Sequence, residues 1–356
     1  MSETYQIERE NRYMEKDDIL KVGIIGYGKM GMLHGALLCG SRKARITAIC
    51  DKSFVMRFGF SRVYKGVHTY TDYKKMLQKE DLDIVVITTP PFIHVECAKE
   101  AMLKGCDVFM EKPLTTEYEK AKDFFSFCEK RKELVQVGFS NRFVPTIAYA
   151  KALVTEGRIG KINNVKAHMY IADVFKKNEG WRYNKAVSGG GVLIDFGIHM
   201  VDLLGWYFGE ISELTAETKQ IYSEQVEDEV YANINFKNGI TCELDTSWSK
   251  ENYRKAYPNM RIYGENGSID VTEQTIAIYD KNESLVVQLA EPQLYSGAFL
   301  DIGGINYAKQ MEEFLENIEN RSYKSACSAV EACYDQRIVK AMYQSAETGK
   351  AVKIED

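Results

Sequence analysis

The sequence lacks the patterns that mark a disulfide-linked, zinc-binding or membrane-spanning protein. Its eight cysteines form no Cys-x-x-Cys pair, and its five histidines show neither His-x-His nor His-x-x-x-His spacing. No apolar run approaches the ~18–20 residues that cross a bilayer. We therefore expect reduced core thiols, no metal site and no membrane partner.

An excess of basic charge is also missing. Lys and Arg number 46 against 51 Asp and Glu, which leaves a net charge of −5. Broad nucleic-acid binding usually needs a basic face, so a nucleic-acid partner is not expected. Residues 1–18 are polar and contain no apolar core of a secretory signal. They predict a polar N-terminal tail on a cytoplasmic protein.

The first third of the chain contains a glycine pattern that opens a helix. An apolar run, 22–25, leads into a G-x-G-x-x-G sequence, and a helical run, 30–39, follows. Glycines let the backbone approach a pyrophosphate, while a helix N-terminus offers free N–H groups and partial positive charge. The pattern therefore predicts a dinucleotide site at Gly26, Gly28 and Gly31.

Asp51 ends the next apolar strand, twenty residues beyond the last of these glycines. At this offset a carboxylate accepts a hydrogen bond from the ribose 2′-hydroxyl. The same carboxylate would repel a 2′-phosphate, which favours NAD. NADP remains possible because Lys52 and Ser53 can hold a phosphate.

Strands and helices alternate up to about residue 140, which predicts a mostly parallel, doubly wound sheet. Ligands lie beyond the carboxyl ends of the strands in such sheets. Lys112 sits at one of these ends, and His94 either lies on a helix surface or touches the nicotinamide side. The candidate cofactor-binding residues are Gly26, Tyr27, Gly28, Lys29, Met30, Gly31, Asp51, Lys52, Thr88, Thr89, Pro90, His94, Glu111 and Lys112.

The pattern changes after about residue 142. Strand-like segments with Asn-Gly turns dominate 211–290, and such runs imply an antiparallel sheet. An amphipathic helix at about 326–348 ends the chain, and we expect it to pack back near the first domain. A chain of 356 residues predicts two domains. We place them at 19–141 and 142–356.

Residues 188–202, SGGGVLIDFGIHMVD, place three polar side chains on one helical stripe: Asp195, His199 and Asp202. A simple Asp–His pair four residues apart would contribute only a few tenths of a kcal/mol. However, polar groups among Val, Leu, Ile and Phe are costly unless they are partnered or used. We therefore interpret the stripe as functional.

The chain resembles the Gfo/Idh/MocA oxidoreductases, which include inositol and sugar dehydrogenases. The matching segments include VGIIGYGKMGMLH, EKPL, GWRYN, SGGGVLIDFGIHMVD and IYGENGSI. The resemblance implies a Rossmann domain followed by an α/β domain with a large, mostly antiparallel open sheet. It also implies NAD or NADP, a sugar or cyclitol substrate, and a dimer or tetramer formed through that sheet. The family's catalytic lysine, aspartate and histidine fall on Lys112, Asp195 and His199.

The hypothesis that follows is oxidation or reduction of a secondary alcohol by hydride transfer to or from nicotinamide C4. His199 would exchange the hydroxyl proton, Lys112 would donate a hydrogen bond to the same oxygen, and Asp195 would orient the sugar or the imidazole. Arg142, Trp181 and Arg182 are further substrate-binding candidates, whereas Asp202 is expected to be structural. Two alternatives remain: a glycoside-cleaving enzyme that oxidises C3 transiently, and a dinucleotide- or sugar-sensing protein without catalysis.

Overall fold

The computed structural model describes residues 19–290, 304–322 and 326–355, so the tail predicted at 1–18 lies outside the described part. The described chain forms two compact units. The first contains residues 19–114, 122–138, 304–322 and 326–329, and the second contains 115–121, 139–290 and 330–355. The chain therefore crosses between the units more than once, and the limits predicted at 19–141 and 142–356 stay a prediction.

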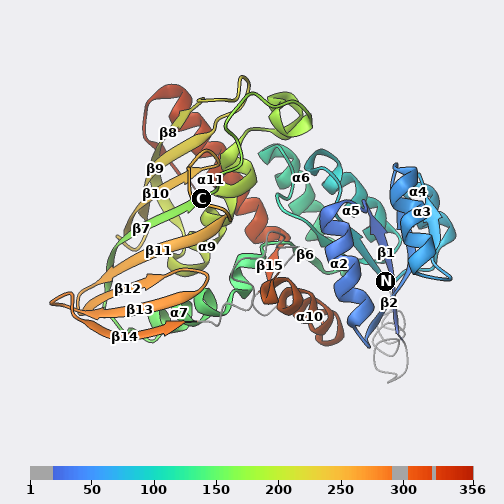
Figure 1. Cartoon of the computed structure of the whole chain (residues 1–356), viewed down its shortest axis with the longest axis horizontal. Helices are drawn as coiled ribbons and strands as arrows, with labels where there is room; N and C mark the ends of the chain where they lie inside the picture. The colour runs from blue at the N-terminus through green and yellow to red at the C-terminus, as the bar shows by residue number, and fades with distance from the viewer. Residues whose placement is uncertain (1–18, 291–303, 323–325, 356) are drawn as a thin grey trace. The chain divides into compact units, whose positions relative to one another are not determined.

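The first unit is built on a seven-stranded sheet in the order β15-β6-β5-β4-β1-β2-β3. All pairs are parallel except β15 with β6, as the alternating pattern predicts. The elements, coloured blue to cyan in Figure 1 apart from the last two, are β1 (Leu20–Ile25), α2 (Lys29–Gly40), β2 (Ala44–Cys50), α3 (Phe54–Val63), β3 (His68–Tyr70), α4 (Tyr73–Lys79), β4 (Ile84–Ile87), the short 3-10 turn Pro91–Ile93, α5 (His94–Leu103), β5 (Asp107–Met110), α6 (Tyr118–Cys128), β6 (Val135–Val137), α10 (Ile305–Asn320) and β15 (Cys327–Ser328).

The central strands of this sheet are buried along their whole length. Every residue of β4 and β5 is buried, which is typical of a parallel sheet covered on both faces. Helix α10 adds Phe314 and Ile318 to the same core, and the Phe314 ring meets Phe109 at 5.5 Å between centroids. The sequence did not predict this return of the chain to the first unit.

The second unit contains a nine-stranded sheet in the order β14-β13-β12-β11-β7-β10-β9-β8-β16. The sheet is mostly antiparallel, as predicted, but β7 and β10 pair in parallel. Figure 1 shows β7 to β14 in green to orange. The elements are the 3-10 turn Ser140–Phe143, α7 (Pro145–Thr155), β7 (Ile162–Tyr170), the 3-10 turn Trp181–Tyr183, α8 (Lys185–Ser188), the π-helix η4 (Leu193–Gly197), α9 (Ile198–Phe208), β8 (Ile211–Lys219), β9 (Glu229–Phe236), β10 (Thr241–Ser247), β11 (Tyr257–Gly264), β12 (Gly267–Val271), β13 (Thr275–Asp280), β14 (Leu285–Ala290), α11 (Ala329–Thr348) and β16 (Val352–Lys353).

Only one face of the second sheet is buried at its centre. In β7, Val165, Ala167 and Met169 are buried, and the residues between them are half-buried or exposed. Helix α11 contacts strand β8 of this sheet, because Ser345 Oγ accepts a hydrogen bond from Ala216 N at 2.9 Å. This alternation is the pattern of a sheet with one covered and one open face. The predicted fold class, a Rossmann domain followed by an α/β domain with a large open sheet, is confirmed.

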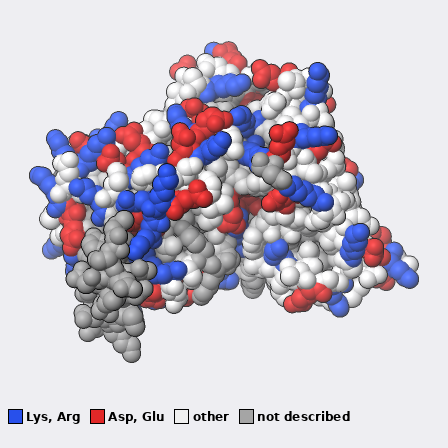
Figure 2. Space-filling model, turned by 180° about the vertical axis from the view of Figure 1, so that it is seen from behind, with Lys and Arg blue, Asp and Glu red and all other residues white. Residues whose placement is uncertain are grey.

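One helical segment, Lys185–Phe208, is long and apolar enough to cross a membrane by length and composition alone. It combines α8, η4 and α9, so it is longer than any single apolar run that the sequence shows. Because 78% of its most apolar window is buried inside the protein, it has the character of a core helix. Figure 2 shows basic and acidic side chains interspersed on the visible surface, in keeping with the small net charge.

Candidate active site

The glycine turn between β1 and α2 has one open position. Gly26 has φ +87° and packs against the Thr88 carbonyl, while a Cβ at Gly31 would collide with the Gly26 carbonyl oxygen. A Cβ at Gly28, in contrast, would meet nothing within 4 Å. Gly28 is the N-cap of α2, and no side chain caps this helix start. The turn therefore fits a pyrophosphate, which would accept from the first amides of α2.

The Asp51 carboxylate is fixed beside this turn. Its Oδ2 accepts from Tyr27 N at 2.6 Å, and its Oδ1 accepts from Ser53 N at 2.7 Å. Arg57 Nη1 donates to the Asp51 carbonyl at 2.6 Å, so a guanidinium also lies close by. The carboxylate is only half-buried. A carboxylate in this position can accept from a ribose hydroxyl, and its negative charge would repel a 2′-phosphate.

The segments that follow β4 and β5 are tied together by His94. Its Nε2 lies 2.6 Å from the Thr89 carbonyl oxygen and its Nδ1 lies 3.0 Å from the Pro113 carbonyl oxygen. The ring is buried, and burial lowers the pKa of the imidazole. His94 is therefore not on the helix surface. Thr88 contributes to the same edge, because its Oγ1 donates to the Gly26 carbonyl at 2.5 Å.

Lys112 follows the end of β5 and is half-buried. Its neighbour Glu111 forms a buried contact with His34, with Oε1 2.7 Å from His34 Nε2, and Glu111 Oε2 accepts from Lys112 N at 3.3 Å. His34 was not among the predicted site residues, although it stands three residues after the last glycine of the motif. The Lys112–Pro113 peptide bond is cis.

In the second unit, Asp195 lies in the π-helix and His199 in the first turn of α9. A π-helical turn is uncommon and is often found at functional sites. His199 is buried, and its ring meets Phe139 edge-on at 5.8 Å. The three polar residues of the predicted stripe lie in one continuous helical segment, although Asp195 stands in a wider turn than that of an α-helix.

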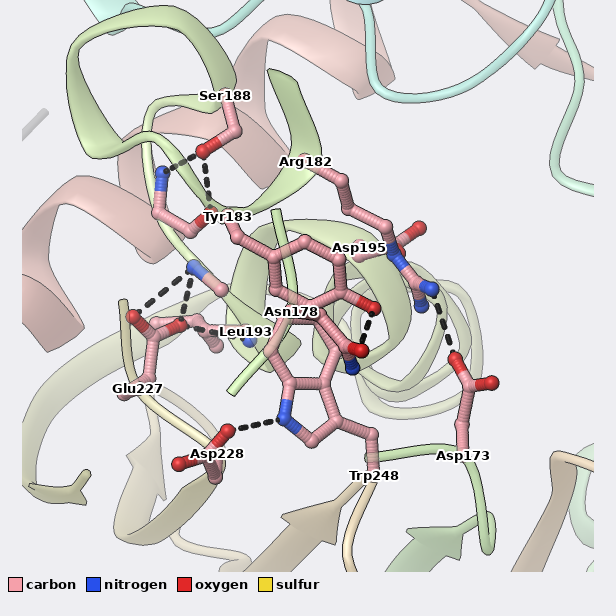
Figure 3. Close-up of polar contacts among 12 residues, drawn as sticks. Asp173, Asn178, Arg182, Tyr183, Ser188, Leu193, Asp195, Glu227, Asp228 and Trp248 are labelled. Carbon is pink, nitrogen blue, oxygen red and sulfur yellow. Dashed lines mark hydrogen bonds and ion pairs between the residues drawn. The ribbon is translucent and has the colours of Figure 1, made fainter. Parts of the chain in front are cut away.

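A buried carboxylate holds the start of this helical segment. Glu227 accepts from Gly191 N at 2.9 and 3.0 Å and from Leu193 N at 3.0 Å, as Figure 3 shows. Tyr343 Oη donates to the same carboxylate at 2.8 Å. Burial raises the pKa of Glu227, and these donors partly offset the increase. No pattern in the sequence indicated this pairing, because Glu227 stands in a loop between β8 and β9.

Arg182 holds the Asp195 carboxylate. Its Nε donates to Asp195 Oδ2 at 2.6 Å, and its Nη1 donates to Asp173 Oδ2 at 2.7 Å. The guanidinium also lies over the Trp248 ring at 4.9 Å, and Trp248 Nε1 donates to Asp228 Oδ1 at 2.6 Å (Figure 3). Arg182 is thus anchored by two acids and an aromatic face. Trp181, its neighbour, is 46% exposed.

Arg142 binds protein carboxylates. Its Nη2 donates to Asp202 Oδ1 at 2.6 Å, its Nε approaches both Asp202 oxygens at 3.0 and 3.1 Å, and its Nη1 donates to Glu331 at 2.7 Å. Arg142 is only 4% exposed and Asp202 is fully buried. The geometry favours a structural role for both residues, as the sequence suggested for Asp202.

The comparisons with known proteins fit these observations. Residues 20–139 match the family model described as "Oxidoreductase family, NAD-binding Rossmann fold", and residues 147–270 match "GFO/IDH/MocA C-terminal domain". The D-glucoside 3-dehydrogenase of Escherichia coli is 26% identical over 357 residues, covering 94% of this chain and 97% of its own. The levoglucosan dehydrogenase of Pseudarthrobacter phenanthrenivorans is 26% identical, covering 77% of each chain.

A solved structure of a levoglucosan dehydrogenase in complex with NADH has a TM-score of 0.86 at 22% identity, covering 95% of this chain and all of its own. This likeness confirms the fold. The fold, the glycine turn and the matched model together define an NAD-binding oxidoreductase. The chain belongs to the GFO/IDH/MocA family, as its motifs suggested.

Proposed function

We propose that the protein is an NAD-dependent dehydrogenase that oxidises a secondary alcohol of a sugar or sugar derivative, or catalyses the reverse reaction. The observation that carries the proposal is the helical segment with Asp195 and His199, whose start is held by Glu227 and whose carboxylate is held by Arg182. The names of two relatives, D-glucoside 3-dehydrogenase and levoglucosan dehydrogenase, support a sugar as the substrate class.

The first unit holds the cofactor in this proposal. When bound, NAD supplies the acceptor for the hydride that leaves the alcohol carbon. The open side of Gly28 and the uncapped start of α2 bind the pyrophosphate. Asp51 accepts from the ribose and disfavours a 2′-phosphate, which gives a preference for NAD. The remaining predicted contacts are Tyr27, Lys29, Met30, Lys52, Thr88, Thr89, Pro90, His94 and Glu111, and we assign His94 a bracing role between loops.

Three side chains carry the proton chemistry. His199 accepts the hydroxyl proton as general base, a role typically worth about 10²–10⁴-fold in rate. Lys112 donates a hydrogen bond to the same oxygen as negative charge develops on it. Asp195, held by Arg182, orients the imidazole or a sugar hydroxyl. Trp181 offers an exposed ring to the sugar, whereas Arg142 stabilises the fold through Asp202 and Glu331.

Assembly and location stay predictions. The open face of the second sheet supports self-association as a dimer or tetramer, because the side chains of β7 on that face are half-buried or exposed and could pack against a second copy. The measurement is the molar mass in solution. A monomer across the micromolar range would contradict the prediction.

The direct test of the proposed function is NADH formation, followed by absorbance, across glucose, galactose, inositols, their glycosides and nucleotide sugars. We expect turnover with NAD to exceed turnover with NADP for at least one sugar. Release of an aglycone without net NADH would instead identify the glycoside-cleaving alternative. Sugar or NAD binding without any turnover would identify a sensor.

A further inference from the structure

A cavity lies in the second unit, and its lining residues are not among those assigned above to chemistry. Its volume is about 300 Å³, and its walls are Lys177, Asn178, Glu179, Gly180, Tyr183, Asn184, Glu224 and Gln225. This is the lower end of the size range of small-molecule sites. Nothing in the proposed mechanism uses this cavity.

The charges that line this cavity largely cancel. Lys177 Nζ pairs with Glu224 Oε2 at 2.8 Å, which leaves the carboxylate of Glu179 as the remaining charge. The other polar side chains are amides and a phenol. Asn178 Nδ2 reaches Tyr183 Oη at only 3.5 Å, a long bond that a ligand hydroxyl could replace. The lining therefore favours a neutral, hydroxyl-rich ligand over a phosphate or a carboxylate.

Two aromatic rings stand in the chain segments that lead into the cavity lining. Phe175 and Tyr222 meet edge-on at 5.9 Å between centroids, two residues before Lys177 and Glu224 respectively, and both are more than one-third exposed. The C–H faces of a pyranose pack on such rings. Exposed apolar side chains that rim a polar hollow are typical of binding sites.

The two segments that lead into the cavity lining are anchored to the core. The buried Asp228 carboxylate accepts from the amides of Ile221, Tyr222 and Ser223 at 2.6–2.9 Å, just before the lining residue Glu224. The amides of residues 173 and 174 donate to the Trp248 carbonyl at 2.9 and 3.0 Å, a few residues before Lys177. Anchoring of this kind lowers the ordering cost of binding.

The cavity adjoins the Asp195 site through shared side chains. Tyr183, a lining residue, meets the Trp248 ring at 5.8 Å, and the Arg182 guanidinium lies 5.8 Å from the Tyr183 ring. Arg182 in turn holds Asp195 at 2.6 Å, as Figure 3 shows. The contacts of Tyr183 and Arg182 therefore connect this cavity to Asp195, the residue proposed to orient the reacting sugar.

We propose that this cavity is a subsite for a neutral glycosyl unit joined to the sugar that reacts, so that the substrate is a disaccharide or larger glycoside. The inference rests on the proposed function. The ring of the second sugar stacks on the Phe175–Tyr222 pair, and its hydroxyl groups replace the long Asn178–Tyr183 hydrogen bond.

The test compares kcat/KM for glucose and galactose with that for maltose, cellobiose and lactose, in the wild type and in Asn178→Ala and Tyr222→Ala. We expect the wild type to prefer a disaccharide at least about tenfold. In each variant the ratio of disaccharide to monosaccharide kcat/KM should fall about tenfold, which is the effect of losing one net hydrogen bond or stacking contact. The kcat/KM for the monosaccharides should stay unchanged. Tyr149→Ala, which removes a 48% exposed tyrosine on α7, is the matched control and should leave the ratio unchanged. Equal loss on both sugar classes, or no disaccharide preference, would overturn the subsite.

A binding measurement separates failure of this inference from failure of the proposed function. Saturation-transfer NMR with the same disaccharides reports binding without any turnover. If no sugar yields NADH but disaccharide binding is weakened in Asn178→Ala and Tyr222→Ala, the subsite stands and the dehydrogenase proposal fails. If NADH forms and neither variant changes disaccharide binding, only the subsite fails.

Discussion

Two glycine-rich runs of this chain, 26–31 and 189–191, stand at the start of helical segments but have different surroundings. In the run at 26–31, one glycine, Gly28, faces open space. In the run at 189–191 none does: a Cβ at Gly189 would lie 2.5 Å from the Thr116 carbonyl oxygen, at Gly190 it would collide with Tyr343 Oη, and at Gly191 with the Glu227 carbonyl oxygen. The first run leaves room for a ligand, and the second lets the protein pack against itself.

The comparison explains why a flexible run precedes the segment with Asp195 and His199. Because the second run has no side chains, the backbone of Glu227 and the ring of Tyr343 come close enough to fix the helix start. Its glycines therefore position side chains, whereas Gly28 has the open space that the proposed cofactor contact needs. Substitutions in the two runs should consequently change different properties.

The largest expected effect is on stability, from Gly191→Ala. The new methyl group overlaps backbone rather than a flexible side chain, so overpacking should cost about 3 kcal/mol. We expect a thermal midpoint lower by about 6–12 °C in calorimetry. Gly40→Ala is the control, because a Cβ there meets nothing within 4 Å. A midpoint equal to that of the control would show that the second run is not close-packed.

The next effect concerns pH and the buried carboxylate, tested by Glu227→Gln. The amide of the variant keeps only part of the hydrogen bonding of Glu227, which should lower the free energy of unfolding by about 1–2 kcal/mol. Burial raises the pKa of Glu227 in the folded state. The contribution of Glu227 to folding stability is therefore fully present below its ordinary pKa of 4.5 and is lost as pH rises through the raised pKa. The gap in thermal midpoint between wild type and variant should therefore narrow from pH 5 to pH 8.

Exposed Glu347→Gln provides the matched control for that experiment, since it also removes one carboxylate. The difference in thermal midpoint between this control and the wild type should not narrow from pH 5 to pH 8. If the Glu227→Gln gap instead widens with pH, the amides and Tyr343 stabilise the ionised carboxylate more than burial opposes it.

The smallest effect is on cofactor affinity, from Gly28→Ala. The methyl group meets no protein atom, so the thermal midpoint should stay within about 1 °C of the wild type. The methyl group would stand where we propose that the pyrophosphate approaches, so the Kd for NAD should rise about tenfold, close to 1.4 kcal/mol. Fluorescence titration with NADH measures this. Unchanged affinity would place the cofactor elsewhere.

The sequence predicted well the features that depend on local pattern. The expected strand at 22–25 and helix at 30–39 agree with β1 and α2 to within about two residues, and Lys112 follows β5 as its motif indicated. Local signals suffice here because the spacing of apolar residues and the glycines of the turn can both be read within a short window of the sequence. The family, its fold and its cofactor class followed from these motifs.

The sequence did not predict the residues that hold the site in place. Glu227 acts on an amide 36 positions away, and His34 meets Glu111 across 77 positions. No periodicity links such pairs. The π-helix at Leu193–Gly197 was also not predicted from the sequence. A single π-helical turn inside a longer helix hardly changes the spacing of its apolar residues, so the sequence pattern still resembles that of an α-helix.

The central claim is that Lys112 and His199 act on one alcohol oxygen in one transition state. A double-mutant cycle of kcat/KM with Lys112→Met, His199→Ala and the combined variant, with NAD affinity measured in each, tests it most directly. We predict losses of about 10²–10⁴-fold in each single variant, intact NAD binding, and a combined loss far below their product. Near-wild-type turnover in either single variant, or losses that multiply, would contradict the claim.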